Sequence, residues 1–121
     1  RGEAQALHIV TAQAENGDAA LDWPALAGDG RTLCVYMGAA VAGRVAGRLI
    51  EAGRDPATPA AVIVDGTLPT QRLVTGRLQD LAELVSEAGS GPALIMIGET
   101  VRRAATWREA TASPERAVAA Q

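Results

Sequence analysis

Some residue types are missing from this chain or nearly so, and each absence removes a class of chemistry. All 11 basic residues are arginine, so no lysine is present to form a Schiff base or to bind phosphate in a P-loop. The single cysteine, Cys34, rules out a disulfide within the chain. No apolar run approaches the ~20 residues that a transmembrane helix needs.

Length and charge favour a single globular domain without a nucleic-acid-binding face. With 121 residues the chain can build one core. Its net charge of −3 argues against binding driven by nucleic-acid phosphates, which requires a basic surface. The chain opens with Arg1-Gly2-Glu3, without an initiator methionine or a signal peptide. We therefore expect a fragment or trimmed chain of a cytoplasmic protein, with no membrane or nucleic-acid partner.

Short apolar runs rich in valine, isoleucine and leucine predict five strands. The predicted strands are His8–Ala12, Thr32–Met37, Ala60–Val64, Gln71–Thr75 and Ala93–Ile97. Only about six residues separate the third strand from the fourth, too few for a crossover helix. These two strands are therefore predicted to be antiparallel neighbours.

Three segments between the strands carry helical signals. The predicted helices are Leu21–Ala27, Ala39–Ala52 and Leu78–Ala88. We expect Asp22 to cap the first helix and Pro24 to lie in its first turn, and Gly53 and Gly89 to end the other two. Strands that alternate with helices predict an α/β fold, here a mixed five-stranded sheet flanked by helices.

Glycine turns follow two of the predicted strands. Tyr36-Met37-Gly38 ends the second strand, and Asp65-Gly66-Thr67 follows the third. A helix is predicted between these strands, so both turns are expected near one edge of the sheet, where open α/β sheets bind ligands. His8, the only histidine, has no acidic residue or cysteine at a metal-ligand spacing, and we expect no metal site.

An ordered series of motifs resembles the C-terminal domain of uroporphyrinogen-III C-methyltransferases, which are tetrapyrrole methylases. The resemblance extends over roughly residues 8–107. Each motif alone is weak, but their order is specific. The motifs are Leu21-Asp22-Trp23, Thr32–Gly38, Leu49–Arg54, Thr58-Pro59, the Gly-Thr-x-Pro-x-Gln-Arg run within Asp65–Leu81, and Pro92–Val101.

The resemblance implies one of two α/β domains that hold S-adenosylmethionine in the cleft between them. Residues 1–121 would form the C-terminal domain, with 100–121 as a tail, and the glycine-rich N-terminal domain is absent from this chain. The implied reaction is methylation of uroporphyrinogen III towards precorrin-2, on the route to sirohaem and cobalamin. The implied partners are the donor or S-adenosylhomocysteine, the tetrapyrrole, the missing N-terminal domain and a second copy in a homodimer. The isolated domain is expected to be inactive.

By resemblance, Met37 and Gly66 match family positions that touch the donor. Gly38 and Thr67 are predicted to bind it as well, although Thr67 can instead bond within its own loop. Arg72 is predicted to meet a carboxylate of the tetrapyrrole; the alternative is that it pins the Asp65–Thr70 loop. No catalytic side chain is identified, because transfer of an activated methyl group depends mainly on alignment.

Two departures from the family pattern concern ligand contacts. Asp65 stands where asparagine is usual, which adds a charge beside the proposed adenine site, and Gln13 stands where histidine is usual. The second departure leaves open another corrin precursor as the substrate. A non-catalytic dimerisation or ligand-binding module also remains open.

Overall fold

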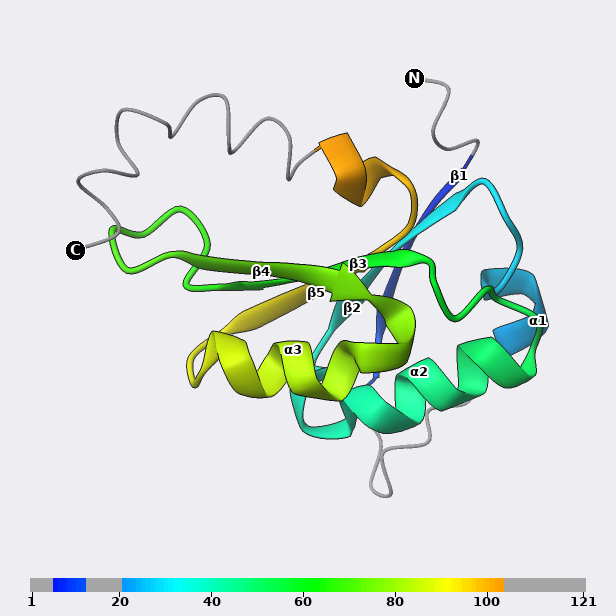
Figure 1. Ribbon diagram of the computed structural model, residues 1–121, viewed down its shortest axis with the longest axis horizontal. Coiled ribbons are helices and arrows are strands. Elements are labelled where there is room, and N and C mark those ends of the chain that lie inside the picture. Colours follow the sequence, from blue (N-terminus) through cyan, green and yellow to red (C-terminus); the bar gives the residue numbers. More distant parts are fainter. Residues whose placement is uncertain (1–5, 13–20, 104–121) are drawn as a thin grey trace.

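The computed structural model describes residues 6–12 and 21–103. Within them, five strands form one sheet and three helices pack against it (Figure 1). The strands are β1 (Ala6–Thr11), β2 (Arg31–Tyr36), β3 (Pro59–Val64), β4 (Arg72–Arg77) and β5 (Ala93–Ile97). The helices are α1 (Trp23–Leu26), α2 (Ala42–Glu51) and α3 (Leu81–Ala88), with 3₁₀ turns η1 (Ala39–Val41) and η2 (Leu78–Asp80) before the last two.

The strands lie in the order β1-β2-β5-β3-β4. β1 and β2 are parallel, whereas β5 is antiparallel to both β2 and β3. β3 and β4 are antiparallel neighbours, which confirms the prediction from their short connection. The mixed five-stranded sheet is therefore confirmed, and β5, the last strand in the sequence, occupies its centre.

The predicted strands differ from the observed ones at their ends. β2 stops at Tyr36, and Met37 lies outside it with a φ of +58°, a left-handed conformation that no strand accommodates. β1 begins before His8 and ends before Ala12, so that prediction was displaced along the chain. β4 starts at Arg72 and continues to Arg77, because its pairing with β3 extends over the full length of that strand.

The three helices begin and end largely as their capping residues predicted. The Asp22 carboxylate accepts a hydrogen bond from the Ala25 amide, and a proline occupies the first turn of α1. Gly53 and Gly89 have φ values of +113° and +84° just after α2 and α3, which confirms them as helix stops. The other two predicted helices were too long at their starts, because each opens with a 3₁₀ turn.

Helices α1, α2 and α3 all lie on one face of the sheet (Figure 1). The core forms between this face and the helices. It consists of aliphatic side chains, the largest of which are Leu33, Val35, Val45, Leu49, Val62, Val64, Leu78, Leu81, Ile95 and Ile97. Leu7 and Ile9 of β1 project from the other face and are about 61% and 64% exposed.

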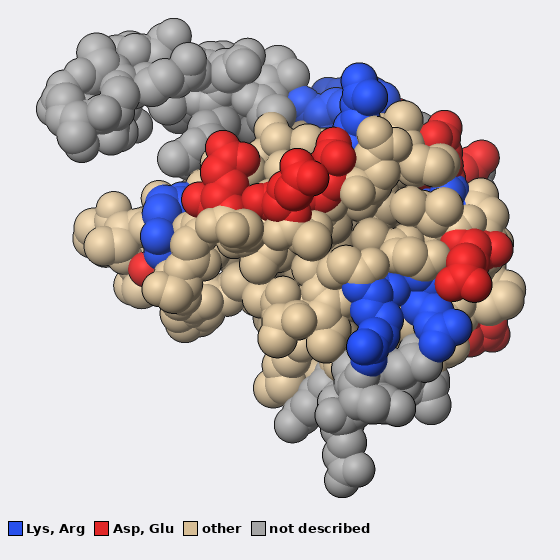
Figure 2. Space-filling view, turned by 60° about the horizontal axis from the view of Figure 1, so that its bottom comes forward, with Lys and Arg blue, Asp and Glu red and all other residues tan. Residues whose placement is uncertain are grey.

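Charged side chains lie on the outer surfaces of the helices. Figure 2 shows acidic residues and arginines in separate small groups across the helix-covered side. Within residues 6–12 and 21–103, no helix is long and apolar enough to cross a bilayer. Of the predicted tail, residues 100–103 are helical, whereas residues 104–121 and Gln13 lie outside the described part of the chain.

Candidate functional site

The two glycine turns meet at one edge of the sheet, as predicted. β2 and β3 both pair antiparallel to β5, so they point the same way and their carboxyl ends share an edge. The start of β5 lies between these ends, and the Asp65 amide donates to the Pro92 carbonyl at 3.0 Å. We call this edge, with its loops 37–38 and 65–67, the loop edge.

Backbone strain is concentrated in these two loops. Among the described residues, those other than glycine with a positive φ are Met37 (+58°), Asp65 (+55°) and Thr67 (+70°). Such conformations cost roughly 1–3 kcal/mol each and persist only where neighbouring contacts enforce them. They are especially unfavourable for a β-branched residue such as Thr67. Strained residues of this kind cluster at ligand-binding sites. These three residues all lie at the predicted ligand-binding site.

Met37 is presented to solvent by its strained backbone. Its side chain is 64% exposed, in contrast with the buried Val35 two residues earlier in β2. An exposed thioether side chain on a strained turn is unsuited to a core role but can fold over a flat apolar ligand. Met37 is therefore not part of the core.

Gly38 and Gly66 are glycines for different physical reasons. A Cβ on Gly38 would lie 2.8 Å from Val35 Cγ1 and 3.3 Å from Ile95 Cδ1, so packing by itself requires a glycine there. A Cβ on Gly66 would lie 3.4 Å from Ile63 Cγ2, which is ordinary contact. Gly66 is exposed, and within the described part of the chain its backbone makes no hydrogen bond. Its bare backbone is open to a ligand, and the donor-binding role of both glycines stays a prediction.

Arg72 has partners within the chain. Its guanidinium donates to the Ser90 carbonyl at 2.7 Å and lies 3.8 Å from Asp65 Oδ2. The same Asp65 oxygen accepts from Thr70 Oγ1 at 3.0 Å. These contacts agree with the alternative that Arg72 pins the loop, and its predicted contact with a tetrapyrrole carboxylate stays a prediction.

Sequence reasoning missed the turn at 89–91 as part of this edge. A Cβ on Gly91 would lie 2.8 Å from Asp65 Oδ1, and one on Gly89 would lie 2.6 Å from the Arg72 guanidinium. Both glycines also have positive φ. The Gly-Ser-Gly run, which one proline separates from β5, was the available signal, but only its first glycine was interpreted, as a helix stop.

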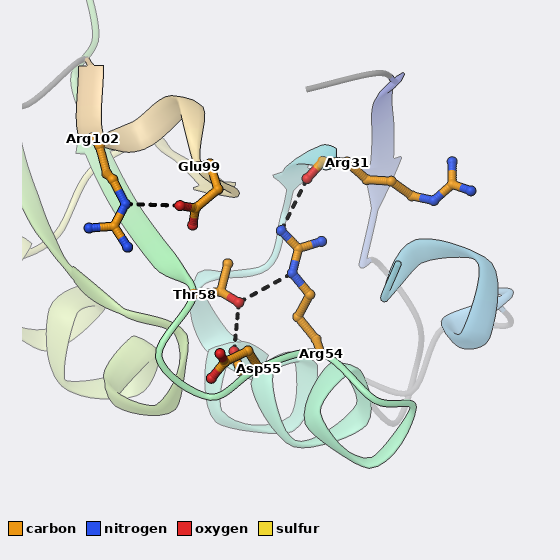
Figure 3. A network of polar contacts seen from close by, with 6 residues as sticks. All are labelled: Arg31, Arg54, Asp55, Thr58, Glu99 and Arg102. Atoms are coloured by element: carbon orange, nitrogen blue, oxygen red, sulfur yellow. Dashed lines mark hydrogen bonds and ion pairs between the residues drawn. The ribbon is translucent and has the colours of Figure 1, made fainter. Parts of the chain in front are cut away.

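The opposite edge of the sheet holds a buried arginine (Figure 3). Arg54, which is 3% exposed, donates to the carbonyls of Gly28 (2.8 Å) and Arg31 (3.1 Å) and to Thr58 Oγ1 (3.3 Å). Burial lowers the pKa of Arg54, while the charges of Asp29 and Glu99 act to raise it. A cavity of about 360 Å³ opens beside this network. Every nitrogen of Arg54 is engaged within the chain, so the network ties the fold together.

The two remaining polar candidates lie apart from the loop edge. His8 is half-buried on β1, with Nε2 at 3.3 Å from a guanidinium nitrogen of Arg31. Cys34 is half-buried rather than fully buried, and burial raises the pKa of its thiol. Within the described residues, no cluster of three or more histidine, cysteine or acidic side chains is arranged to hold a metal ion.

Comparison with known proteins identifies the family to which this chain is similar. Residues 2–82 match the model of the Tetrapyrrole (Corrin/Porphyrin) Methylases. The chain is 48% identical over 101 residues to a siroheme synthase of Neisseria meningitidis serogroup C, a match that covers 84% of this chain and 21% of that protein. The chain thus spans about a fifth of the length of the curated relatives that it matches.

Solved structures agree with the sequence match. A uroporphyrin-III C-methyl transferase from Thermus thermophilus, complexed with S-adenyl homocysteine, superposes with a TM-score of 0.70 and 33% identity. That match covers 84% of this chain and 45% of the Thermus chain. A cobalt precorrin-4 methyltransferase, with a TM-score of 0.72 and 20% identity, shares the fold. On the strength of the family match and the shared fold, this chain belongs to the tetrapyrrole methylases.

Proposed function

We propose that this chain is the C-terminal, donor-binding half of an S-adenosylmethionine-dependent uroporphyrinogen-III C-methyltransferase. The observation that carries the proposal is the convergence of two strained loops, containing Met37 and Gly66, at one sheet edge. Its relatives include siroheme synthases and a Thermus methyltransferase that was crystallised with S-adenyl homocysteine. S-adenosylhomocysteine, which remains after the donor has transferred its methyl group, is therefore the first ligand to test.

The chemistry of methyl transfer suits a site made of backbone and soft side chains. The sulfonium already activates the methyl group, so the protein has to bind the donor, orient it and exclude water. Backbone carbonyls and amides can hold the adenine and ribose, and a glycine such as Gly66 lets them approach closely. The exposed Met37 supplies a polarizable surface for the adenosine.

The remaining parts of the site are proposed to come from outside this chain. The Thermus relative is more than twice as long as the matched region. An N-terminal domain would close the cleft over the loop edge, and a second copy would complete a homodimer. The tetrapyrrole substrate would enter between the two domains, where the guanidinium of Arg72 could meet one of its carboxylates.

Calorimetric titration with S-adenosylhomocysteine tests the proposal, both on this chain and on the full-length gene product. We expect the full-length protein to bind S-adenosylhomocysteine and this chain not to bind it, because the donor site would span two domains. A Met37→Ala variant should weaken that binding, whereas Leu7→Ala on β1, which is equally exposed, should leave it unchanged. The absence of binding to both proteins would overturn the methyltransferase proposal in favour of a non-catalytic module.

The substrate itself is tested separately by methyl transfer from labelled donor in the full-length protein. Uroporphyrinogen III is the expected acceptor. If only a later corrin precursor accepts the methyl group, the fold and donor site stand and the substrate assignment fails. The departure from the family pattern at Gln13 leaves this second acceptor class open.

A further inference from the structure

The side chain of Gln71 closes the loop that contains Gly66. Gln71 Oε1 accepts a hydrogen bond from the Thr67 amide at 2.7 Å. The backbone between them forms two consecutive turns: the Leu68 amide donates to the Asp65 carbonyl at 3.0 Å, and the Gln71 amide donates to the Leu68 carbonyl at 2.9 Å. Gln71 is therefore joined to the loop through both its backbone and its side chain.

The contact from Gln71 fixes the direction of one peptide group. The Thr67 N–H and the Gly66 C=O belong to the same planar, trans peptide unit, in which these two groups point in opposite directions. Since the N–H points at Gln71, the Gly66 carbonyl points away from Gln71. Within the described residues, that carbonyl accepts no hydrogen bond from the chain.

The strained backbone of Thr67 makes such a contact necessary. Thr67 has a φ of +70°, which a β-branched residue adopts only when its surroundings hold it there. The loop ends are held separately, by the contacts of Asp65 with Thr70 and of Arg72 with Ser90. Loss of the Gln71 acceptor would therefore release the Gly66–Thr67 peptide while the base of the loop stays in place.

We propose that Gln71 is a positioning residue, which turns the Gly66 carbonyl towards the bound donor to accept a hydrogen bond from the 6-amino group of its purine. The inference rests on the proposed function. It explains why a glutamine, with an acceptor at the end of a flexible side chain, follows a loop whose functional group is a backbone carbonyl. It also assigns base selectivity to the loop, because a 6-oxo purine presents an acceptor where the carbonyl needs a donor.

The experiment compares two ligands on the full-length gene product by calorimetry: S-adenosylhomocysteine and its inosine analogue, which carries a 6-oxo group. The unaltered protein should prefer the amino form. Gln71→Ala and Gln71→Met, which both lack the acceptor, should bind S-adenosylhomocysteine about tenfold more weakly, the loss of one hydrogen bond. In both variants, the ratio of the affinity for S-adenosylhomocysteine to the affinity for the inosine analogue should fall towards one.

Two further variants separate positioning from general stability. Gln71→Glu keeps an acceptor oxygen and should recover most of the affinity and the selectivity. Gln79→Ala makes the same chemical change at an exposed position near the opposite edge and should alter neither. A purely structural role would lower the melting temperature without changing the ratio of the two affinities.

The possible failures are distinguishable. If the unaltered protein does not bind S-adenosylhomocysteine, the proposed function falls and this inference falls with it. If the unaltered protein binds it and the Gln71→Ala and Gln71→Met variants keep both affinity and selectivity, this inference alone is overturned. The Met variant preserves side-chain length, so it provides the test if the Ala variant does not fold.

Discussion

The two edges of the sheet use polar groups in opposite ways. At the edge near Arg54, a charged side chain is buried and each of its nitrogens is bonded to the chain. At the loop edge, the backbone is strained, Met37 and Gly66 are exposed, and the Gly66 carbonyl accepts no hydrogen bond from the described residues. Polar groups that are hydrogen-bonded within the chain stabilise the fold. Polar groups without such a partner, in a strained loop, are available to a ligand.

The largest expected effect follows from removing the buried cation. Arg54→Met should lower the free energy of unfolding by about 3 kcal/mol, because the part-buried carbonyls of Gly28 and Arg31 would lose the donors that Arg54 supplies. Urea denaturation of this chain measures the loss. Arg44→Met on the exposed side of α2 is the matched control and should cost less than about 0.5 kcal/mol. If both variants lost the same unfolding free energy, the hydrogen bonds of Arg54 would not stabilise the fold, and the two edges would not differ in this way.

The second effect compares two glycines within the loop edge. Gly38→Ala should lower the free energy of unfolding by roughly 1–3 kcal/mol, because its Cβ would overlap Val35. Gly66→Ala has room for a Cβ and should change it by less than about 0.5 kcal/mol. Only the second should weaken S-adenosylhomocysteine binding at unchanged stability in the full-length protein. A Gly66 variant with unaltered affinity would contradict the backbone-approach interpretation.

A smaller effect is expected at the ion pair of the loop edge. Asp65→Asn keeps an acceptor for Thr70 but removes the charge that faces Arg72 at 3.8 Å. Both side chains are solvent-accessible, so the loss in unfolding free energy should stay below about 1 kcal/mol and disappear at high salt. Urea denaturation at low and high sodium chloride measures it, with Glu87→Gln on α3 as control. A large, salt-independent loss would indicate a buried role for Asp65.

The smallest effect concerns Cys34, on the sheet face away from the helices. Burial raises the pKa of its thiol, so alkylation should need a higher pH than for a free cysteine. The stability associated with the protonated thiol is present below the ordinary cysteine pKa and is lost as pH rises through the raised value. Iodoacetamide rates against pH, in native and urea-unfolded chain, measure the shift. Identical profiles would show that burial does not affect the thiol.

The positions of the helices could be predicted from the sequence because neighbouring residues determine where a helix begins and ends. Asp22, Gly53 and Gly89 mark helix boundaries through caps and left-handed φ, which depend on neighbouring residues only. Strand ends were less predictable. Whether Met37 continues β2 depends on a strained φ that the rest of the fold imposes, and the length of β4 depends on its pairing with β3.

The sequence by itself determined the α/β class, the antiparallel pairing of β3 with β4, and the two glycine loops, because periodicity, short connections and turn residues act locally. Only the tertiary structure decided that β5 separates β2 from β3, that Arg54 is buried, and that Gln71 holds the Thr67 amide. These features join residues through space, by pairing, burial and hydrogen bonding. Their geometry therefore exists only once the sheet has formed.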